Sequence, residues 1–237
     1  MIRFENVNIG YHEALLKVKF TELTRGHAYA LIGENGSGKS TFLKTISGQI
    51  SPFEGRLLIN DLDSNGIVNK ERSRLISFVP TQTAVISNIS VFDFVGLGRT
   101  PYLNALGRFS KKDIEIIELA MSQLNISHLR QKMLNELSDG ERQLSAIASA
   151  ISQETPIILL DEPTSYLDYR NKLLVLEKVK DLAKTQNKCI LFSTHDLDMV
   201  SENLETVVCA RGKNKQLELL LGKISKEKLI EVAFNFV

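Results

Sequence analysis

The sequence predicts an α/β fold with a largely parallel sheet. Short apolar segments alternate with segments of helical spacing along the chain. Residues 157–161 (IILLD) form the continuous apolar run expected of a parallel strand that is buried on both faces. Residues 27–32 (HAYALI) read as a strand that leads into a glycine-rich loop, and a helix is expected directly after it at 39–47.

The other elements follow in chain order. Residues 2–9 and 14–20 are expected to form two short strands around a turn at Gly10. Further strands are expected at 56–59, 75–79 and 188–193, and helices at 91–97, 111–124, 141–152 and 171–184. In 141–152, helical spacing places four apolar residues on one stripe, namely Leu144, Ile147, Ala148 and Ile151. The tail, 212–237, is expected to hold a strand and a short amphipathic helix.

The chain is interpreted as one domain with a helical insertion, because 237 residues suffice for one sizeable core. The stretch 84–152 is mostly helical and lies between two strand-rich blocks. We therefore expect a nucleotide-binding core from 1–83 and 153–211, a helical subdomain at 84–152, and a short C-terminal extension at 212–237.

The composition is that of an ordinary globular protein, with 43% hydrophobic and 24% charged residues. The formal net charge is +1, so overall charge offers no argument for a nucleic-acid partner. Cys189 and Cys209 both lie in apolar stretches and are expected to be small buried hydrophobes. No signal-peptide core and no run of about 18 apolar residues is present, so work at a membrane is expected to require a partner.

A phosphate-binding loop is predicted at 33–40. Its residues are Gly33, Glu34, Asn35, Gly36, Ser37, Gly38, Lys39 and Ser40, which fit the pattern G-x-x-x-x-G-K-[ST]. Glycines let backbone N–H groups turn toward phosphate oxygens, and the following helix points its positive end at the same anion. Lys39 is expected to reach the β- and γ-phosphates of ATP, and the Ser40 hydroxyl to ligate Mg²⁺. The alternative, a chance glycine-rich turn, does not account for the strand before the loop and the helix after it.

A second carboxylate site is predicted where the run 157–161 ends. Asp161 closes the strand at the edge where such sheets bind ligands, and Glu162 follows at once. Adjacent residues at a strand end point in different directions, so one carboxylate can serve the metal while the next faces the attacking water. Glu162 is therefore the candidate general base. The alternative is that these acids are solvated residues at a strand end without a functional role. The presence of the phosphate loop favours the functional interpretation.

Several further segments resemble the ATP-binding cassette (ABC) ATPase family, whose fold is a P-loop NTPase fold with an N-terminal antiparallel β subdomain and a helical insertion. Residues 137–143 (LSDGERQ) resemble the family signature, with Asp139 in place of a glycine and Glu141 in place of a glutamine. Residues 161–168 (DEPTSYLD) resemble its Walker B motif and D-loop. Gln82 matches the Q-loop, His195 the switch histidine, and Tyr11 the aromatic residue that stacks on adenine.

The resemblance implies a role for each of these residues. ATP and Mg²⁺ are the expected cofactors, with Thr41 extending the ATP-binding loop and with Ser40, Gln82 and Asp161 at the metal, Asp161 through a water molecule. His195 would hold the γ-phosphate and the group that polarises the water, and Asp168 would link the two sites of a dimer. The signature residues would act on the nucleotide of a second copy; they are Ser138, Asp139, Gly140 and Glu141.

Residues 96–102 (GLGRTPY) look like a segment found in ATPase subunits that import iron-siderophores, haem, cobalamin and related metal chelates. This resemblance implies a homodimer at the cytoplasmic face of the cell membrane, bound to transmembrane permease subunits and served indirectly by a substrate-binding protein. Residues 84–110, with Arg99 and Tyr102, would form the surface that receives the permease; a plain loop with a proline turn is the alternative.

Other members of the family remain alternatives. Zinc and manganese importers carry similar segments, and exporter ATPases differ only at the importer-like segment. A soluble ABC ATPase that acts on nucleic acid fits less well, because the chain has one phosphate loop and no heptad run.

Overall fold

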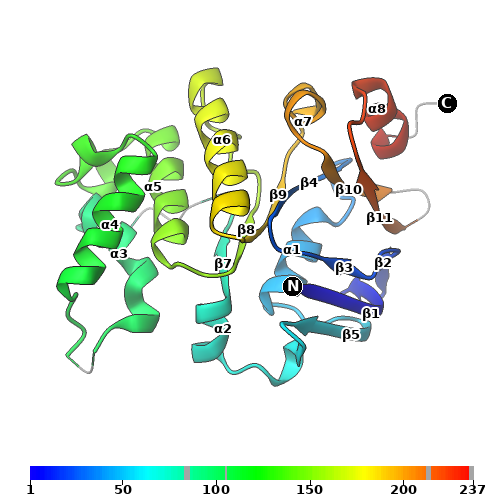
Figure 1. Cartoon of the computed structure of the whole chain (residues 1–237), viewed down its shortest axis with the longest axis horizontal. Coiled ribbons are helices and arrows are strands. Elements are labelled where there is room, and N and C mark those ends of the chain that lie inside the picture. Colours follow the sequence, from blue (N-terminus) through cyan, green and yellow to red (C-terminus); the bar gives the residue numbers. More distant parts are fainter. Residues whose placement is uncertain (83–85, 105, 212–214, 235–237) are drawn as a thin grey trace.

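The computed structural model describes residues 1–82, 86–104, 106–211 and 215–234 (Figure 1). The strands are β1 (Ile2–Gly10), β2 (Ala14–Val18), β3 (Glu22–Leu23), β4 (His27–Gly33), β5 (Glu54–Ile59), β6 (Leu62–Asp63), β7 (Ile76–Val79), β8 (Ile157–Leu160), β9 (Cys189–Ser193), β10 (Thr206–Arg211) and β11 (Gln216–Leu221). The α-helices are α1 (Lys39–Ser47), α2 (Asn69–Leu75), α3 (Val91–Gly96), α4 (Lys111–Gln123), α5 (Asp139–Ser152), α6 (Tyr169–Thr185), α7 (Leu197–Asn203) and α8 (Lys226–Phe234). Short 3₁₀ turns complete the chain, and the longest of them, η2, spans Leu97–Tyr102.

Within the described part of the chain the strands form one 11-stranded sheet, in the order β6-β5-β1-β2-β11-β10-β4-β9-β8-β7 with β3 beside β1. The run β10-β4-β9-β8-β7 is parallel. In the N-terminal unit, β2 and β5 each pair antiparallel with β1, one on either side of it. The prediction of a parallel α/β sheet with an N-terminal antiparallel unit is therefore confirmed.

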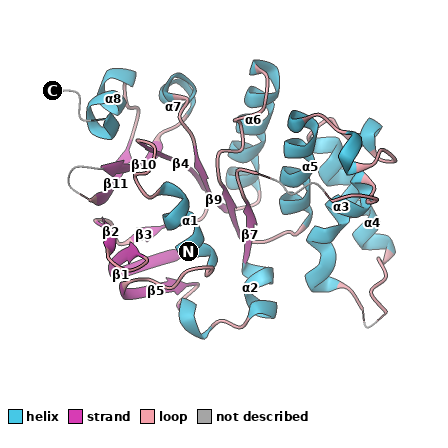
Figure 2. Cartoon of the chain, turned by 180° about the vertical axis from the view of Figure 1, so that it is seen from behind, coloured by secondary structure: helices cyan, strands magenta, loops and turns pink. Residues whose placement is uncertain are grey.

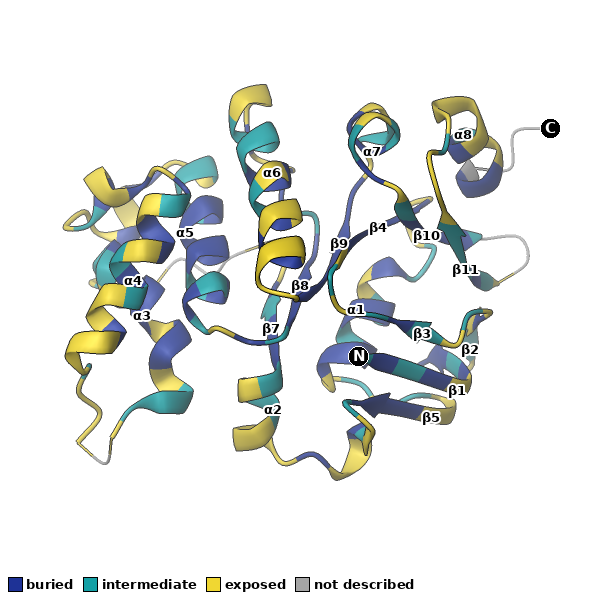
Figure 3. Ribbon diagram, viewed as in Figure 1, coloured by how far each residue is buried: buried dark blue, intermediate teal, exposed yellow. Residues whose placement is uncertain are grey.

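The parallel strands are buried on both faces, as their apolar runs predict (Figure 3). On β4, Ala28, Ala30 and Ile32 pack in one cluster with residues of α5 and α6. Their neighbours Tyr29 and Leu31 pack in a second cluster with residues of α1 and β1. Helix α1 thus contacts both the parallel strands and the N-terminal unit, which holds the loop before it against the sheet.

Helices α3, α4 and α5 pack against one another at one end of the molecule (Figure 2). Helix α4 begins at a capping box in which the Ser110 hydroxyl and the Asp113 carboxylate each satisfy the other's backbone N–H. Figure 1 shows this helical end beyond β7, away from the N-terminal strands.

Several helices and strands differ from the sequence-based expectation. Helix α2 has no buried residue, so the polar stretch 69–75 carries no apolar stripe from which to predict it, and the strand expected from residue 75 begins at Ile76. Helix α7 has only seven residues and is N-capped by Asp196, whose carboxylate accepts the Met199 N–H. The apolar stretch 206–211 around Cys209 is the unpredicted strand β10.

Both cysteines are buried and form no disulfide, as predicted. Burial raises the pKa of Cys189 and of Cys209 to about 12, so both thiols stay protonated at neutral pH. In the described ranges, no helix combines the length and the apolar character that crossing a membrane requires.

Arg99 was predicted to lie on a surface, and the structure shows that this is wrong: its side chain is only 4% exposed. Its Nε donates to Asp113 Oδ1 at 2.9 Å, and its Nη1 donates to Ser152 O at 2.7 Å and to Glu154 Oε2 at 2.9 Å. Its guanidinium also lies 4.2 Å from the centre of the Tyr102 ring. Arg99 therefore joins η2 to α4 and to the end of α5 inside the fold.

Close packing of η2 inside the fold also explains the glycine at position 98. A Cβ on Gly98 would lie 2.2 Å from Ser149 O, so η2 approaches the α5 backbone too closely for any side chain at this position. Tyr102 donates its hydroxyl to Gln153 O at 3.0 Å, and Gln153 Nε2 donates to Ser73 O at 2.6 Å. The segment thus ties the end of α5 to α2.

We expect Arg99→Met to lower the free energy of unfolding by about 3–5 kcal/mol, because it leaves the Asp113 carboxylate without its buried partner. Arg130→Met is the matched control. Arg130 also donates Nε to a carboxylate, at 2.7 Å, and lies over an aromatic ring, but its side chain is 43% exposed. We expect it to cost about 0–1 kcal/mol. Urea unfolding measures both, and equal losses would contradict a structural role special to Arg99.

Candidate functional site

The predicted phosphate loop connects β4 to α1. Gly33 ends β4, and the backbone turns through Gly36 at φ +78° and Gly38 at φ +95°. Left-handed values of this kind favour glycine. Gly38 is also the N-cap of α1 and offers no side-chain hydrogen bond to the helix. The first N–H groups of α1 therefore remain available to an anion.

Lys39 is the first residue of α1 and is 6% exposed. Its ammonium donates to Gly33 O at 2.8 Å and to Glu34 O at 2.9 Å, and so spans the loop from within. Burial lowers the pKa of Lys39, and the charges of Glu162 and Asp161 oppose this shift. The loop is thus closed around a cation, which suits it to bind phosphate.

The two predicted carboxylates follow β8, the strand next to β9. Asp161 is 4% exposed, and its N–H donates to Val79 O of β7 at 2.8 Å. Glu162 has a left-handed backbone, with φ +50°. His195 Nε2 lies 2.5 Å from Glu162 Oε1. The structure therefore brings together Lys39, Asp161, Glu162 and His195 at one edge of the sheet.

Two serines of this edge escaped the sequence analysis. Ser193, at the end of β9, donates its hydroxyl to Asp161 Oδ1 at 2.7 Å and accepts the Glu162 N–H at 2.7 Å. Ser165 donates its hydroxyl to Glu162 Oε2 at 3.1 Å. Ser165 lies inside the recognised segment 161–168. Ser193 lies two residues before His195, in a run that reads only as a buried strand.

The oxygen groups at this edge fit a magnesium ion. Asp161 Oδ1 is taken by Ser193, whereas Oδ2 has no hydrogen-bond partner among the described residues. Ser40 lies in the first turn of α1 and is exposed. Carboxylate and hydroxyl oxygens, together with phosphate oxygens and water, are the ligands that Mg²⁺ prefers. The donor set therefore suits a magnesium nucleotide.

The predicted signature forms the start of α5. Ser138 is the N-cap, and its hydroxyl accepts the Glu141 N–H at 3.2 Å. Glu141 in turn accepts from the Ser138 N–H and hydroxyl, both at 2.9 Å, and this backbone hydrogen bond lowers the pKa of Glu141. Arg142 pairs with Asp139, the other residue that departs from the family pattern. The two substituted acids are thus held within the helix terminus.

Gly140 lets the signature lie against the segment that follows Glu162. A Cβ at Gly140 would lie 3.1 Å from Tyr166 O, so a larger residue would press the two segments apart. Asp168 is the N-cap of α6 and accepts the Asn171 N–H at 2.8 Å. Within the described ranges, no hydrogen bond or ion pair joins 138–142 to the phosphate loop at 33–41.

Two further predicted residues, Tyr11 and Gln82, have exposed side chains. Tyr11 lies between β1 and β2 and is 56% exposed. Gln82 follows β7 and is exposed. In the described ranges, no hydrogen bond joins either residue to Asp161 or Glu162, so their roles stay predictions.

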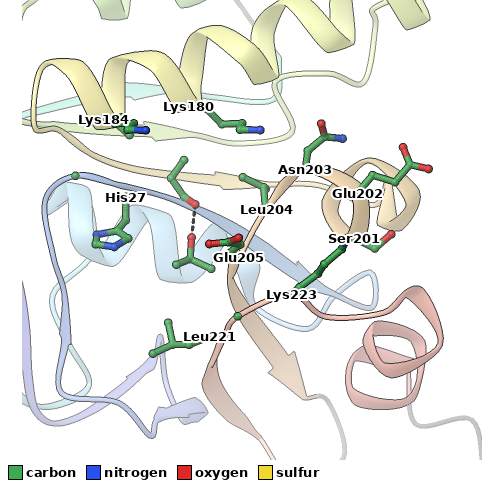
Figure 4. A pocket seen from close by; sticks show the side chains of 15 residues that line it. His27, Lys180, Lys184, Ser201, Glu202, Asn203, Leu204, Glu205, Leu221 and Lys223 are labelled. Atoms are coloured by element: carbon green, nitrogen blue, oxygen red, sulfur yellow. Dashed lines mark hydrogen bonds between the residues drawn. The ribbon is translucent and has the colours of Figure 1, made fainter.

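A cavity of about 750 Å³ lies elsewhere (Figure 4). His27 and Thr206 lie in its lining at the N-terminal ends of β4 and β10, whereas the phosphate loop follows the C-terminal end of β4. Its labelled side chains mix Lys180, Lys184 and Lys223 with acids. It shares no residue with the predicted nucleotide site.

The sequence and the overall fold are similar to those of known proteins. The family described as ABC transporter matches residues 16–165. A probable siderophore transport system ATP-binding protein of Bacillus subtilis is 30% identical over 214 residues, which cover 90% of this chain and 78% of that protein. Two solved structures are similar throughout. One is described as an inward-facing metal-chelate type ABC transporter, with 28% identity, TM-score 0.80, and coverage of 99% of this chain and 88% of that one. The other is a dimeric ATP-binding cassette bound to ADP and Pi after hydrolysis, with 26% identity, TM-score 0.81, and coverage of 95% and 100%.

Proposed function

The chain belongs to the ABC transporter family as an ATP-hydrolysing subunit, and from this premise we propose that it drives import of a metal chelate such as an iron-siderophore, haem or cobalamin. The observation that carries the choice of substrate class is the siderophore transport protein that aligns over 90% of this chain. The structural neighbour of metal-chelate type supports the same class. A zinc or manganese importer is the second candidate, since the segment at 96–102 suits both.

The binding of ATP is assigned to the loop at 33–41. Lys39 already donates to two backbone carbonyls, and we propose that it transfers these bonds to the β- and γ-phosphates when nucleotide binds. The backbone N–H groups before and within the first turn of α1 would hold the remaining phosphate oxygens. Ser40, Asp161 and Gln82 would hold Mg²⁺, which neutralises phosphate charge, and Tyr11 would stack on the adenine.

Hydrolysis is assigned to Glu162 with His195. Glu162 receives a hydrogen bond from Ser165, and His195 lies 2.5 Å from its other carboxylate oxygen, so both oxygens have fixed partners. A carboxylate held in this way can orient a water molecule and accept its proton as the water attacks the γ-phosphate. His195 would keep Glu162 and the γ-phosphate in fixed positions relative to each other.

We propose that a second copy completes the site. Ser138 and Gly140 lie at a helix N-terminus, which binds anions readily, yet no contact joins them to the phosphate loop of their own chain in the described ranges. In a head-to-tail pair, this terminus would meet the γ-phosphate of the partner copy. Asp168 lies two residues after Tyr166, whose backbone Gly140 approaches closely. Asp168 would link the two sites of the pair.

The permease surface is assigned to a groove between α2 and η2 instead of to Arg99, which is buried. The groove encloses about 550 Å³, and its lining includes Arg74, Leu97 and Pro101. Leu97 is 46% exposed, and Arg74 donates to Pro101 O at 2.8 Å. An apolar side chain beside a fixed cation suits a short cytoplasmic helix of a permease. The helical subdomain at 84–152, the core on either side of it and the extension at 212–237 remain our proposed division; residues 83–85, 105, 212–214 and 235–237 lie outside the described ranges.

The experiment is to purify the tagged protein from gently solubilised membranes of its native cell and to identify its partners by mass spectrometry. We expect a polytopic permease in the eluate, to which this protein would be bound at the cytoplasmic face of the membrane. Leu97→Asp should reduce permease recovery at least several-fold. Leu106→Asp is the control, because Leu106 is 77% exposed and does not line the groove. Recovery with ribosomes or DNA and without a permease would overturn the transport function.

A further inference from the structure

Ser193 lies between the two carboxylate residues of the site. It ends β9 and is 0% exposed. Its hydroxyl donates to Asp161 Oδ1 and accepts the Glu162 N–H, and both distances are 2.7 Å. One buried hydroxyl therefore contacts the two residues to which metal binding and proton transfer are assigned above.

The direction of both hydrogen bonds is fixed. An ionised carboxylate can only accept, and a backbone N–H can only donate. The Ser193 proton must then point at Asp161, while a lone pair faces Glu162. A hydroxyl with both partners set in this way cannot rotate without leaving a buried polar group unpaired.

This arrangement has a consequence for each partner. The bond to Oδ1 orients the Asp161 carboxylate so that Oδ2 is the oxygen left for another ligand. The bond to the Glu162 N–H secures a backbone with φ +50°, which residues other than glycine adopt at a cost in free energy. That backbone directs the Glu162 side chain to His195 and Ser165.

We propose that Ser193 is a positioning residue for ATP hydrolysis, which sets the metal-binding orientation of Asp161 and the left-handed backbone of Glu162 together. The proposal rests on the roles assigned to Asp161 and Glu162 above. A hydrogen-bonding partner behind a metal ligand is worth about 10–100-fold in metal affinity or activity in other proteins.

The test compares Ser193→Ala, Ser193→Val and Ser193→Thr. Valine and threonine have the same shape, and only threonine keeps a hydroxyl, so their difference isolates the two hydrogen bonds. We measure kcat, the Mn²⁺ affinity by electron paramagnetic resonance with a non-hydrolysable ATP analogue, the affinity for that analogue without metal, and the midpoint of thermal unfolding.

We expect Ser193→Ala and Ser193→Val to lower kcat and Mn²⁺ affinity about 10–100-fold, with metal-free nucleotide affinity within about threefold of the wild type. Ser193→Thr should restore most of both losses. Wild-type kcat and Mn²⁺ affinity in Ser193→Ala, or equal values for the valine and threonine variants, would overturn the proposal.

Asp161→Asn and Glu162→Gln in the same assays separate this inference from the roles on which it rests. If Asp161→Asn keeps its Mn²⁺ affinity, or Glu162→Gln its turnover, the assigned roles themselves fail. If both variants lose these properties and Ser193→Ala does not, only the role of Ser193 fails.

Discussion

Glu162→Gln is expected to lower steady-state ATP turnover by about 10²–10⁴-fold and to leave nucleotide affinity unchanged, because an amide cannot accept the proton of the attacking water. Glutamine has the size of glutamate and keeps an oxygen for the Ser165 hydroxyl, which donates at 3.1 Å. The side chain can therefore stay in place while its basicity is lost. Phosphate release and nucleotide binding by fluorescence measure the two properties separately.

Glu177→Gln is the control for this variant. Glu177 is exposed on α6 and lines a separate groove with Asp168 and Tyr169, which includes no residue of the phosphate loop. We expect its turnover to equal that of the wild type. Undiminished turnover in Glu162→Gln would remove Glu162 from the catalytic role, whatever the control shows.

Lys39→Met is expected to weaken ATP binding by tenfold or more. A hydrogen bond to a charged group contributes about 1.5–3 kcal/mol, and about 1.4 kcal/mol corresponds to tenfold in Kd. Methionine has a similar length and no charge, so it fills the space inside the loop but cannot hold phosphate. Isothermal titration with Mg-ATP measures the effect.

Lys188→Met is the matched control. Lys188 is also 6% exposed, it donates to one backbone carbonyl, Thr155 O, at 2.6 Å, and burial lowers its pKa as it does for Lys39. Its substitution is expected to reduce stability without changing ATP affinity. A loss of affinity as large as that of Lys39→Met would indicate that any buried lysine supports the fold of the site, and would contradict a direct role in phosphate binding.

The apolar strands of the parallel sheet and the residues of the proposed catalytic edge could be predicted from the sequence. A continuous apolar run such as 157–161 has few structural interpretations other than a buried strand in a chain of this size. The motif residues also lie together at one edge of the sheet; they are Lys39, Asp161, Glu162 and His195. Helix α2 could not be predicted, because it buries no residue and so leaves no periodic signal.

Two side chains show the limits of local patterns. Arg99, between glycine and threonine, reads as an exposed charge, yet partners distant in sequence, such as Asp113 and Glu154, surround it. Ser193 reads as one more residue of a buried strand, and the function proposed for it depends on Asp161, 32 positions earlier. Only the tertiary structure brings such pairs together.

Two copies are proposed to close over ATP and complete each site, and sedimentation of Glu162→Gln with and without Mg-ATP measures this closure. We expect one copy per particle without nucleotide or with ADP, and two copies with ATP, because in the proposed pair the γ-phosphate would bridge the phosphate loop of one copy and the α5 terminus of the other. Adding Ser138→Arg should abolish the ATP-dependent pair while ATP still binds. A Glu162→Gln protein that binds ATP and yet sediments as a single copy would contradict the claim.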